Sequence, residues 1–234
     1  MTTTMTRHDP YPSRDVATAT ITPRRDPVLH GPSAPGPLSD DRLRDYERTG
    51  VLVLPDHLDA ATTAEVDAAV LAAGDDPAVR ATLTAILARA SRELRSLFEV
   101  HHGDGPIARL TRSPALVDIA RQLLADDVYV HQSRVNLKPG FRGREFYWHS
   151  DFETWHTEDG MPRMRAVSCS VLLTPNLPHN GPLLTIEGSH QWFVACVGET
   201  PENHHERSLR QQEIGVPDDD SLSELARRGP IRSA

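Results

Sequence analysis

Residues 146–156 read FYWHSDFETWH, and half of the twelve aromatic residues of the chain fall between positions 141 and 155. On a strand, side chains two apart share a face, so His149 and Asp151 are expected to project together. One imidazole and one carboxylate are two thirds of the facial triad that holds ferrous iron in non-haem oxygenases. A surface hydrogen-bonded pair is the alternative, but aromatic walls can exclude water and favour a small-molecule pocket.

Other histidines are weaker candidates for metal ligands. His156 lies seven residues after His149, on the opposite strand face or beyond the strand end, so we expect a structural or loop role for it. Four more lie beside turn-forming residues or in a polar run, and we assign them loop roles; these are His179, His190, His204 and His205.

Length and composition exclude several classes of protein. The 234 residues can bury a sizeable core, and 38% hydrophobic with 25% charged residues is typical of a soluble globular protein. A formal charge of −8 repels a phosphate backbone, so no nucleic-acid partner is expected. The sequence has no apolar run of signal or transmembrane length, which predicts no membrane partner. Cys169 and Cys196 are too few for a disulfide framework, which favours the cytoplasm.

The chain divides by composition into an arm and one domain. The arm, 1–38, is rich in proline and is expected to be disordered or to lie extended over the body. The domain, 39–234, is expected to be helical over 39–126, rich in strands over 127–197 and polar over 198–234. Helices followed by several short strands predict an α+β protein, with an antiparallel sandwich or barrel and helices packed outside it.

Apolar spacing and capping residues predict the elements of the domain. Helices are expected at 39–50, 59–73, 78–98, 114–124 and 222–227. Strands are expected at 51–54, 128–137, 165–174 and 183–186.

Residues 146–156, continuing through 158–162, closely resemble the signature of ectoine hydroxylases within the phytanoyl-CoA dioxygenase superfamily. A run of this length is far more specific than a His-X-Asp pair. The resemblance covers most of the chain after the arm, including the segments 36–39, 130–141, 178–182, 188–190 and 198–204.

The resemblance implies a double-stranded β-helix, which is a jelly-roll, cupin-like core, with flanking N-terminal helices. It also implies an oxidoreductase, an iron(II)- and 2-oxoglutarate-dependent dioxygenase that uses O2 to hydroxylate ectoine to 5-hydroxyectoine, a compatible solute in osmotic and heat stress. A homodimer is suggested as well.

The resemblance assigns roles residue by residue. His149 and Asp151 match the first two iron ligands and are the catalytic and metal-binding candidates. Gln132, Thr154 and Trp155 match positions associated with ectoine, and Lys138, Asn136, Phe146 and Ser168 match positions around 2-oxoglutarate. An indole face suits a delocalised cation, and a lysine offers a point charge to a carboxylate. Each position also has a structural interpretation: exposed amides for Gln132 and Asn136, a turn lysine for Lys138, core packing for Phe146 and Trp155, and a satisfied strand hydroxyl for Ser168.

A third iron ligand is the point at which this sequence departs from the family pattern. The resemblance implies a histidine on a late strand and an arginine after it, both beyond 215–220. No histidine follows His205, and the late arginines Arg227, Arg228 and Arg232 lie outside the expected context. We therefore expect a chain shortened at its C-terminus, without the last strands and with exposed sheet edges.

Three interpretations follow from this departure. The chain is a shortened ectoine hydroxylase, another dioxygenase of the superfamily that acts on a different small substrate, or a non-catalytic fragment that keeps part of an ectoine pocket. The long signature favours the first over the second, and the missing ligand leaves the third open.

Overall fold

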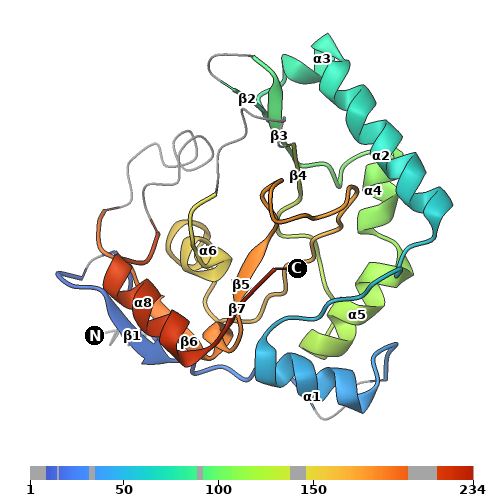
Figure 1. Cartoon of the computed structure of the whole chain (residues 1–234). Helices are drawn as coiled ribbons and strands as arrows, with labels where there is room; N and C mark the ends of the chain where they lie inside the picture. Colours follow the sequence, from blue (N-terminus) through green and yellow to red (C-terminus); the bar gives the residue numbers. More distant parts are fainter. Residues whose placement is uncertain are drawn as a thin grey trace, which may run out of the picture.

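The helices of the first half of the chain line one side of the molecule, and short antiparallel strands pair in and around its centre (Figure 1). The fold is given by a computed structural model that describes residues 9–14, 16–31, 35–88, 92–137, 146–199 and 215–233. This is an α+β arrangement, as predicted. The helices are α1 (Asp40–Thr49), α2 (Ala60–Asp75), α3 (Pro77–Arg80), α4 (Pro106–Thr111), α5 (Pro114–Leu124), α6 (Asp151–Asp159), the 3₁₀-helix η1 (Ser189–Gln191) and α8 (Asp219–Arg228). The strands are β1 (Thr20–Pro23), β2 (Ala85–Leu87), β3 (Leu94–Phe98), β4 (Arg134–Asn136), β5 (Leu184–Ile186), β6 (Trp192–Ala195) and β7 (Ile231–Ser233).

Local capping signals predicted several helices correctly. Ser39 accepts a hydrogen bond from the Arg42 amide at the start of α1, and Gly50 ends the helix with a φ of 76°, a conformation that favours glycine. Two further helix starts are marked in the sequence. Pro114 occupies the first position of α5, and the Asp218 carboxylate accepts a hydrogen bond from the Ser221 amide at the start of α8. The expected helices at 39–50, 59–73, 114–124 and 222–227 are therefore confirmed.

The expected helix at 78–98 is wrong. The alanine-rich segment leaves the helix after α3, and β2 then pairs with β3 and β3 with β4 in one antiparallel sheet. Helix propensity is a weak preference, and here hydrogen bonding to a third strand distant in sequence overrides it. The strand predicted at 128–137 is correspondingly shorter and is limited to β4.

Two expected strands are not strands in the described part of the chain. The segments 51–54 and 165–174 run without a paired neighbour. Their apolar side chains are nevertheless used for packing: Leu52 and Leu54 contact the cluster around Leu43, and Val171 contacts the cluster around Val66. The apolar pattern of these two segments therefore indicates side-chain packing rather than pairing with a neighbouring strand. The strand predicted at 183–186 is confirmed as β5, which pairs with β7.

The described part of the N-terminal arm is laid over the body and contributes to its core. Strand β1 pairs with β6 in antiparallel register, from Thr20 with Ala195 to Pro23 with Trp192. The side chain of Tyr11 is fully buried among Phe152, Met164, Phe193 and Ala195. The arm thus covers the side of α6 that packs against β6.

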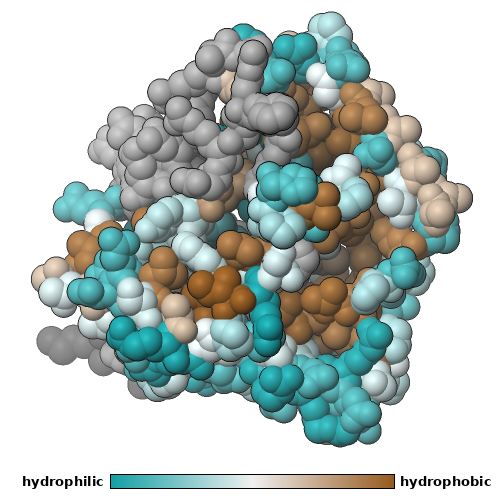
Figure 2. Space-filling model, in the orientation of Figure 1, coloured by the Kyte–Doolittle hydropathy of each residue, from teal (hydrophilic) through white to brown (hydrophobic). Residues whose placement is uncertain are grey.

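Apolar side chains gather in three clusters and on part of the surface. The first cluster surrounds Tyr11 and α6, the second joins α1 to α5, and the third joins α2 to α4. On the face shown in Figure 2, apolar side chains also gather near the middle of the molecule, where β5 and β7 lie. Leu183, Leu184 and Ile231 are 47%, 44% and 52% exposed there. Among the helices that the structure describes, none has the length and apolar character needed to cross a membrane.

Candidate active site

The residues predicted to lie on a strand at 149–151 instead start a helix. Ser150 is extended at the N-cap position, and Asp151 and Glu153 place acidic groups in the first turn of α6. Gly160 ends the helix with a φ of 71°. The sequence carries this signal as Ser150 followed three residues later by Glu153, a spacing typical of a helix start. The strand prediction failed because strand alternation was assumed where the chain turns into α6 directly after Ser150, whose side chain makes no cap hydrogen bond.

His149 and Asp151 nevertheless converge. His149 Nε2 lies 3.4 Å from Asp151 Oδ1, and the two side chains are 21% and 35% exposed. The Nδ1 atom of His149 lies 2.6 Å from the Tyr147 carbonyl oxygen, which accepts a hydrogen bond when Nδ1 is protonated. The Ser168 hydroxyl donates to Asp151 Oδ2 at 2.7 Å. His149 is thus held through Nδ1 and Asp151 through Oδ2, while Nε2 of the histidine and Oδ1 of the aspartate face each other.

The two groups stabilise each other's charged form. Burial disfavours the charged imidazole, but hydrogen bonds to the Asp151 carboxylate and the Tyr147 carbonyl outweigh it and raise the pKa of His149. Burial also disfavours the carboxylate, but hydrogen bonds from His149 and Ser168 outweigh it and lower the pKa of Asp151. Arg134 adds a nearby positive charge that acts on both groups. Protons therefore compete with any metal for His149, because a metal takes the neutral imidazole.

The geometry of the pair fits a divalent metal. Ligand atoms in neighbouring positions around a first-row ion, at bond lengths of about 2.1 Å, lie about 3 Å apart. The Tyr147 carbonyl favours the tautomer that leaves Nε2 of His149 free to ligate, which is a common outer-shell arrangement in metal sites. Among the described residues, no group of three histidine, cysteine, aspartate or glutamate side chains is placed to hold a metal. His149 and Asp151 are therefore a candidate ligand pair within the described residues.

Thr154 and Trp155 lie on α6 one turn after Asp151, on the same side of the helix. The ring of Trp155 meets the imidazole of His131 edge to face at 5.2 Å between centroids. His131 Nε2 also lies 3.0 Å from Oδ2 of Asp159, at the end of α6. His131 thus contacts the helix at two points, one of which is a predicted ectoine residue.

The remaining predicted ligand residues lie near β4. Gln132 precedes the strand and is exposed, while the Asn136 amide oxygen accepts from the Ser96 hydroxyl at 2.9 Å. Within the described ranges, neither amide hydrogen bonds to His149 or Asp151. The ring of Phe146 lies below the guanidinium groups of Arg95 and Arg134, at 5.0 Å and 5.7 Å. Lys138 lies outside the described residues.

Sequence reasoning missed Arg134 and His131. Arg134 lies two residues before Asn136 on β4, so the alternation of strand faces places these two side chains on one face, and Gln132 lies two residues earlier, before the strand. That signal was present and would have added a positive charge to the predicted anion site. His131 had no such signal, because its contacts depend on the position of a helix that was read as a strand.

Two of the other candidate histidines, His156 and His190, make contacts that stabilise the fold. His156 belongs to α6, and its Nδ1 and Nε2 lie 2.6 Å from the Met161 carbonyl oxygen and 3.0 Å from Oδ1 of Asp9. This agrees with the structural role expected for it, although on a helix. His190 belongs to η1 and contacts the Glu47 carbonyl through Nε2 at 3.0 Å. His179 lies in an exposed turn, and His204 and His205 fall outside the described residues.

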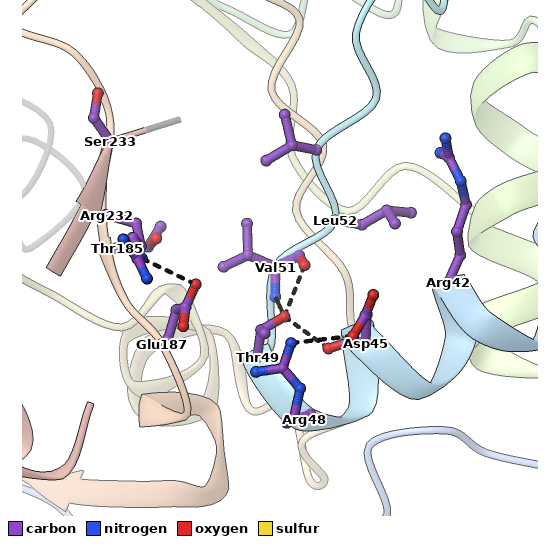
Figure 3. Close-up of a pocket in the computed structure, with 11 residues that line it drawn as sticks. Arg42, Asp45, Arg48, Thr49, Val51, Leu52, Thr185, Glu187, Arg232 and Ser233 are labelled. Atoms are coloured by element: carbon purple, nitrogen blue, oxygen red, sulfur yellow. Dashed lines mark hydrogen bonds and ion pairs between the residues drawn. The ribbon is translucent and has the colours of Figure 1, made fainter. Parts of the chain in front are cut away.

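A cavity of about 460 Å³ lies elsewhere, between α1 and the β5–β7 pair (Figure 3). Its lining includes the charged residues Arg42, Asp45, Arg48, Glu187 and Arg232. It contains none of the residues predicted for iron, 2-oxoglutarate or ectoine. It is thus separate from the pair formed by His149 and Asp151.

Known proteins resemble this chain over most of its length. A family model described as phytanoyl-CoA dioxygenase matches residues 46–227. The ectoine dioxygenase of Sphingopyxis alaskensis is 52% identical over 224 residues, which are 95% of this chain and 73% of that protein. The ectoine dioxygenase of Streptomyces anulatus is 48% identical over an alignment of 236 positions, which covers 98% of this chain and 77% of that protein.

Solved structures give the same result. The crystal structure of EctD from S. alaskensis with 2-oxoglutarate and 5-hydroxyectoine has a TM-score of 0.84 to this chain at 46% identity, and the match covers 97% of this chain and 74% of that one. The structure of EctD from S. alaskensis with bound Fe also has a TM-score of 0.84, with coverages of 97% and 75%.

Proposed function

The chain belongs to the phytanoyl-CoA dioxygenase family and, within it, to the ectoine dioxygenases, and we propose that His149, Asp151 and their neighbours perform the reaction of that group. The chain is an iron(II)- and 2-oxoglutarate-dependent dioxygenase that hydroxylates ectoine to 5-hydroxyectoine. The observation that carries the site assignment is the 3.4 Å separation of His149 Nε2 and Asp151 Oδ1 within the signature segment.

His149 and Asp151 would hold the iron, and their neighbours would orient them. When bound, iron(II) with 2-oxoglutarate supplies the oxidative chemistry that places one atom of dioxygen on ectoine and the other in succinate. The Tyr147 carbonyl keeps the proton of His149 on Nδ1, and the Ser168 hydroxyl holds Asp151 through Oδ2. These contacts leave Nε2 and Oδ1 directed toward the same point, so little reorganisation is needed for binding.

Charged and aromatic groups around the pair would select the two organic substrates. We assign Phe146, Asn136, Ser168 and Lys138 to 2-oxoglutarate, and the positive charge of Arg134 suits the carboxylates that both substrates carry. Gln132, Thr154 and Trp155 are assigned to ectoine. Thr154 and Trp155 project from α6 on the side that carries Asp151, which supports a substrate position beside the metal.

Replacing Trp155 with leucine is expected to raise the KM for ectoine about 10-fold, because the indole face would lose its attraction to the delocalised amidinium cation. The KM for 2-oxoglutarate is expected to stay within about twofold, which provides the internal control. Steady-state kinetics with each substrate varied in turn measure both constants. An unchanged KM for ectoine would remove Trp155 from the ectoine site.

Product analysis tests the function itself. The protein, supplied with iron(II), 2-oxoglutarate, ectoine and oxygen, is expected to form 5-hydroxyectoine and succinate in equal amounts, as measured by NMR. A chelator should stop both products, and added iron(II) should restore them. Succinate formed without 5-hydroxyectoine would show that ectoine is not the substrate that this site hydroxylates.

Several finer properties belong to the same proposal. We propose that the antiparallel pairs are parts of a double-stranded β-helix, a jelly-roll core, which is supported by the similarity to EctD. The division into a 1–38 arm and a 39–234 dioxygenase domain is kept, with the described arm packed on that domain. The two free cysteines fit a cytoplasmic enzyme. A homodimer, a role in osmotic and heat stress, and the absence of nucleic-acid and membrane partners complete the proposal.

A further inference from the structure

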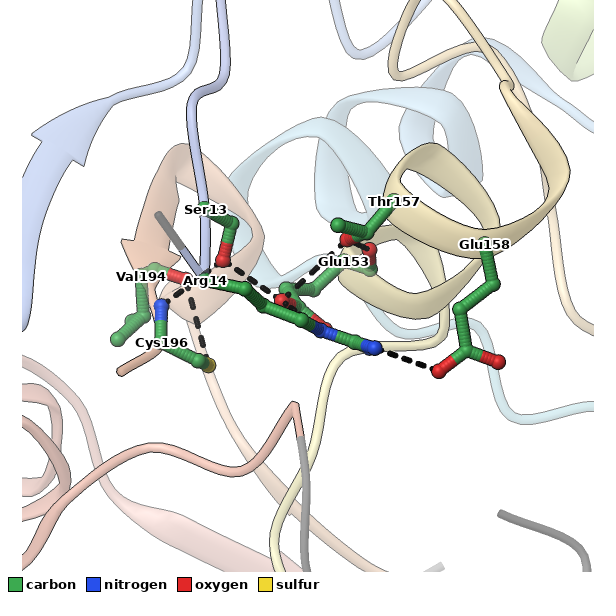
Figure 4. Close-up of polar contacts among 7 residues, drawn as sticks. All are labelled: Ser13, Arg14, Glu153, Thr157, Glu158, Val194 and Cys196. Carbon is green, nitrogen blue, oxygen red and sulfur yellow. Dashed lines mark hydrogen bonds and ion pairs between the residues drawn. The ribbon is translucent and has the colours of Figure 1, made fainter. Parts of the chain in front are cut away.

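Arg14, a buried arginine of the N-terminal segment, hydrogen bonds to two glutamates of α6 (Figure 4). Arg14 Nε donates to Glu153 Oε1 at 3.1 Å, and Nη2 donates to Glu153 Oε2 at 2.9 Å, which makes a bidentate pair. Nη1 donates to Glu158 Oε1 at 2.6 Å. The side chains of Arg14 and Glu153 are 2% and 1% exposed. A planar guanidinium donates to a carboxylate in few orientations, so this contact restrains both the position and the rotation of α6.

Ser13, which precedes Arg14, and Gly215 complete the surroundings of the same carboxylate. The Ser13 hydroxyl donates to Glu153 Oε1 at 2.6 Å and accepts from the Cys196 amide at 2.9 Å, which ties the contact to the end of β6. Gly215 covers it from another side, because a Cβ there would collide with Glu153 Oε2 and the Arg14 guanidinium. Three chain segments distant in sequence thus enclose one glutamate of α6.

The backbone of Arg14 shows that this contact is specific. Its φ is 69°, in the left-handed region that residues other than glycine rarely adopt. Its amide donates to the Cys196 carbonyl oxygen at 2.8 Å, which holds the backbone in this conformation while the side chain reaches α6. Strained conformations of this kind persist only where the surroundings determine them, and they are frequent near functional sites.

We propose that Arg14 is a positioning residue of the active site, which holds the first turn of α6 so that Asp151 faces His149 and Thr154 faces the substrate. Glu153 lies two residues after Asp151 and directly before Thr154 in that turn. Because a helix moves as a rigid unit, a shift of Glu153 carries both residues with it. The inference rests on the proposed function through the assignments of Asp151 as a metal ligand and of Thr154 to the substrate.

Cobalt(II) binding to the full chain tests this role without requiring turnover. Arg14→Lys keeps the charge but loses the two-pronged contact, and it is expected to weaken cobalt(II) affinity about 10-fold, the lower end of the loss caused by removing a group that orients a ligand. It should also raise the KM for ectoine, through Thr154. Ser13→Ala, which removes one hydrogen bond to Glu153, is expected to weaken cobalt(II) affinity about twofold to threefold and decides the question if Arg14→Lys does not fold.

Val66→Ala is the matched control, because Val66 is 4% exposed in the separate cluster between α2 and α4. It should lower the Tm and leave cobalt(II) affinity unchanged. The proposal is overturned if folded Arg14→Lys and Ser13→Ala bind cobalt(II) like the unsubstituted protein, or if Val66→Ala weakens binding as much as they do. Failure of the unsubstituted protein to bind cobalt(II) would also overturn it, whereas a failure of the proposed reaction appears only in the product assay.

Discussion

Replacing either His149 or Asp151 with alanine is expected to abolish formation of 5-hydroxyectoine. Each change removes a metal ligand and leaves its partner without the 3.4 Å contact that now joins them. Because the oxidation depends on the bound metal, we expect a loss of about 1000-fold or more in kcat/KM. Product formation under saturating iron(II) and 2-oxoglutarate measures it, and metal titration of the same variants shows whether the metal is lost.

His179→Ala is the control for this experiment. His179 lies in an exposed turn, so its removal is expected to leave the rate within about twofold. Circular dichroism should show that all three variants are folded. If either ligand variant kept a substantial rate, the assignment of the pair would be wrong and another residue would have to hold the metal.

Replacing Tyr11 with alanine is expected to cost about 4 kcal/mol of unfolding free energy. Truncating a fully buried aromatic side chain leaves a cavity, which typically costs about 3–5 kcal/mol. The Tyr11 hydroxyl also accepts from the amides of Arg25 and Asp26 and donates to Asp26 Oδ2, at 2.8, 3.0 and 2.8 Å. Because domains are stable by only about 5–15 kcal/mol, a large share of the stability depends on this arm residue.

Urea denaturation measures the effect, with two comparison variants. Tyr11→Phe keeps the ring and should lose about 1–3 kcal/mol, the cost of unpaired hydrogen-bonding groups. Tyr129→Ala removes the same side-chain type at a position that is 80% exposed, so its unfolding free energy should change by about 0.5 kcal/mol at most. A loss below about 1 kcal/mol for Tyr11→Ala would contradict the view that the arm is part of the core.

Signals that act within one turn could be predicted from the sequence, and those that depend on distant partners could not. Ser39 and Gly50 mark the ends of α1 because capping is a local effect. The segment 78–98 failed because a strand pairing decides its structure. His149 and Asp151 were expected together from a strand spacing, and the resemblance also assigned both; they do converge, but at the start of α6 rather than on a strand.

Arg134 and Arg14 differ in the same respect. Arg134 could have been found from its two-residue spacing with Asn136 on β4. Arg14 could not, because its partner Glu153 lies 139 residues further along the chain and no pattern in the sequence connects them.

The contact between Ser13 and Cys196 also bears on how the chain is made, because 183 residues separate the two. A ribosome adds about 5–20 residues per second, so Ser13 waits about 10 s or longer for Cys196 to emerge. Local elements such as α1 and α2 can form during that interval, while Tyr11 and the residues of β1 stay open to chaperones and proteases. The core around α6 is therefore expected to close only after β6 has left the ribosome, and the β5–β7 pair later still.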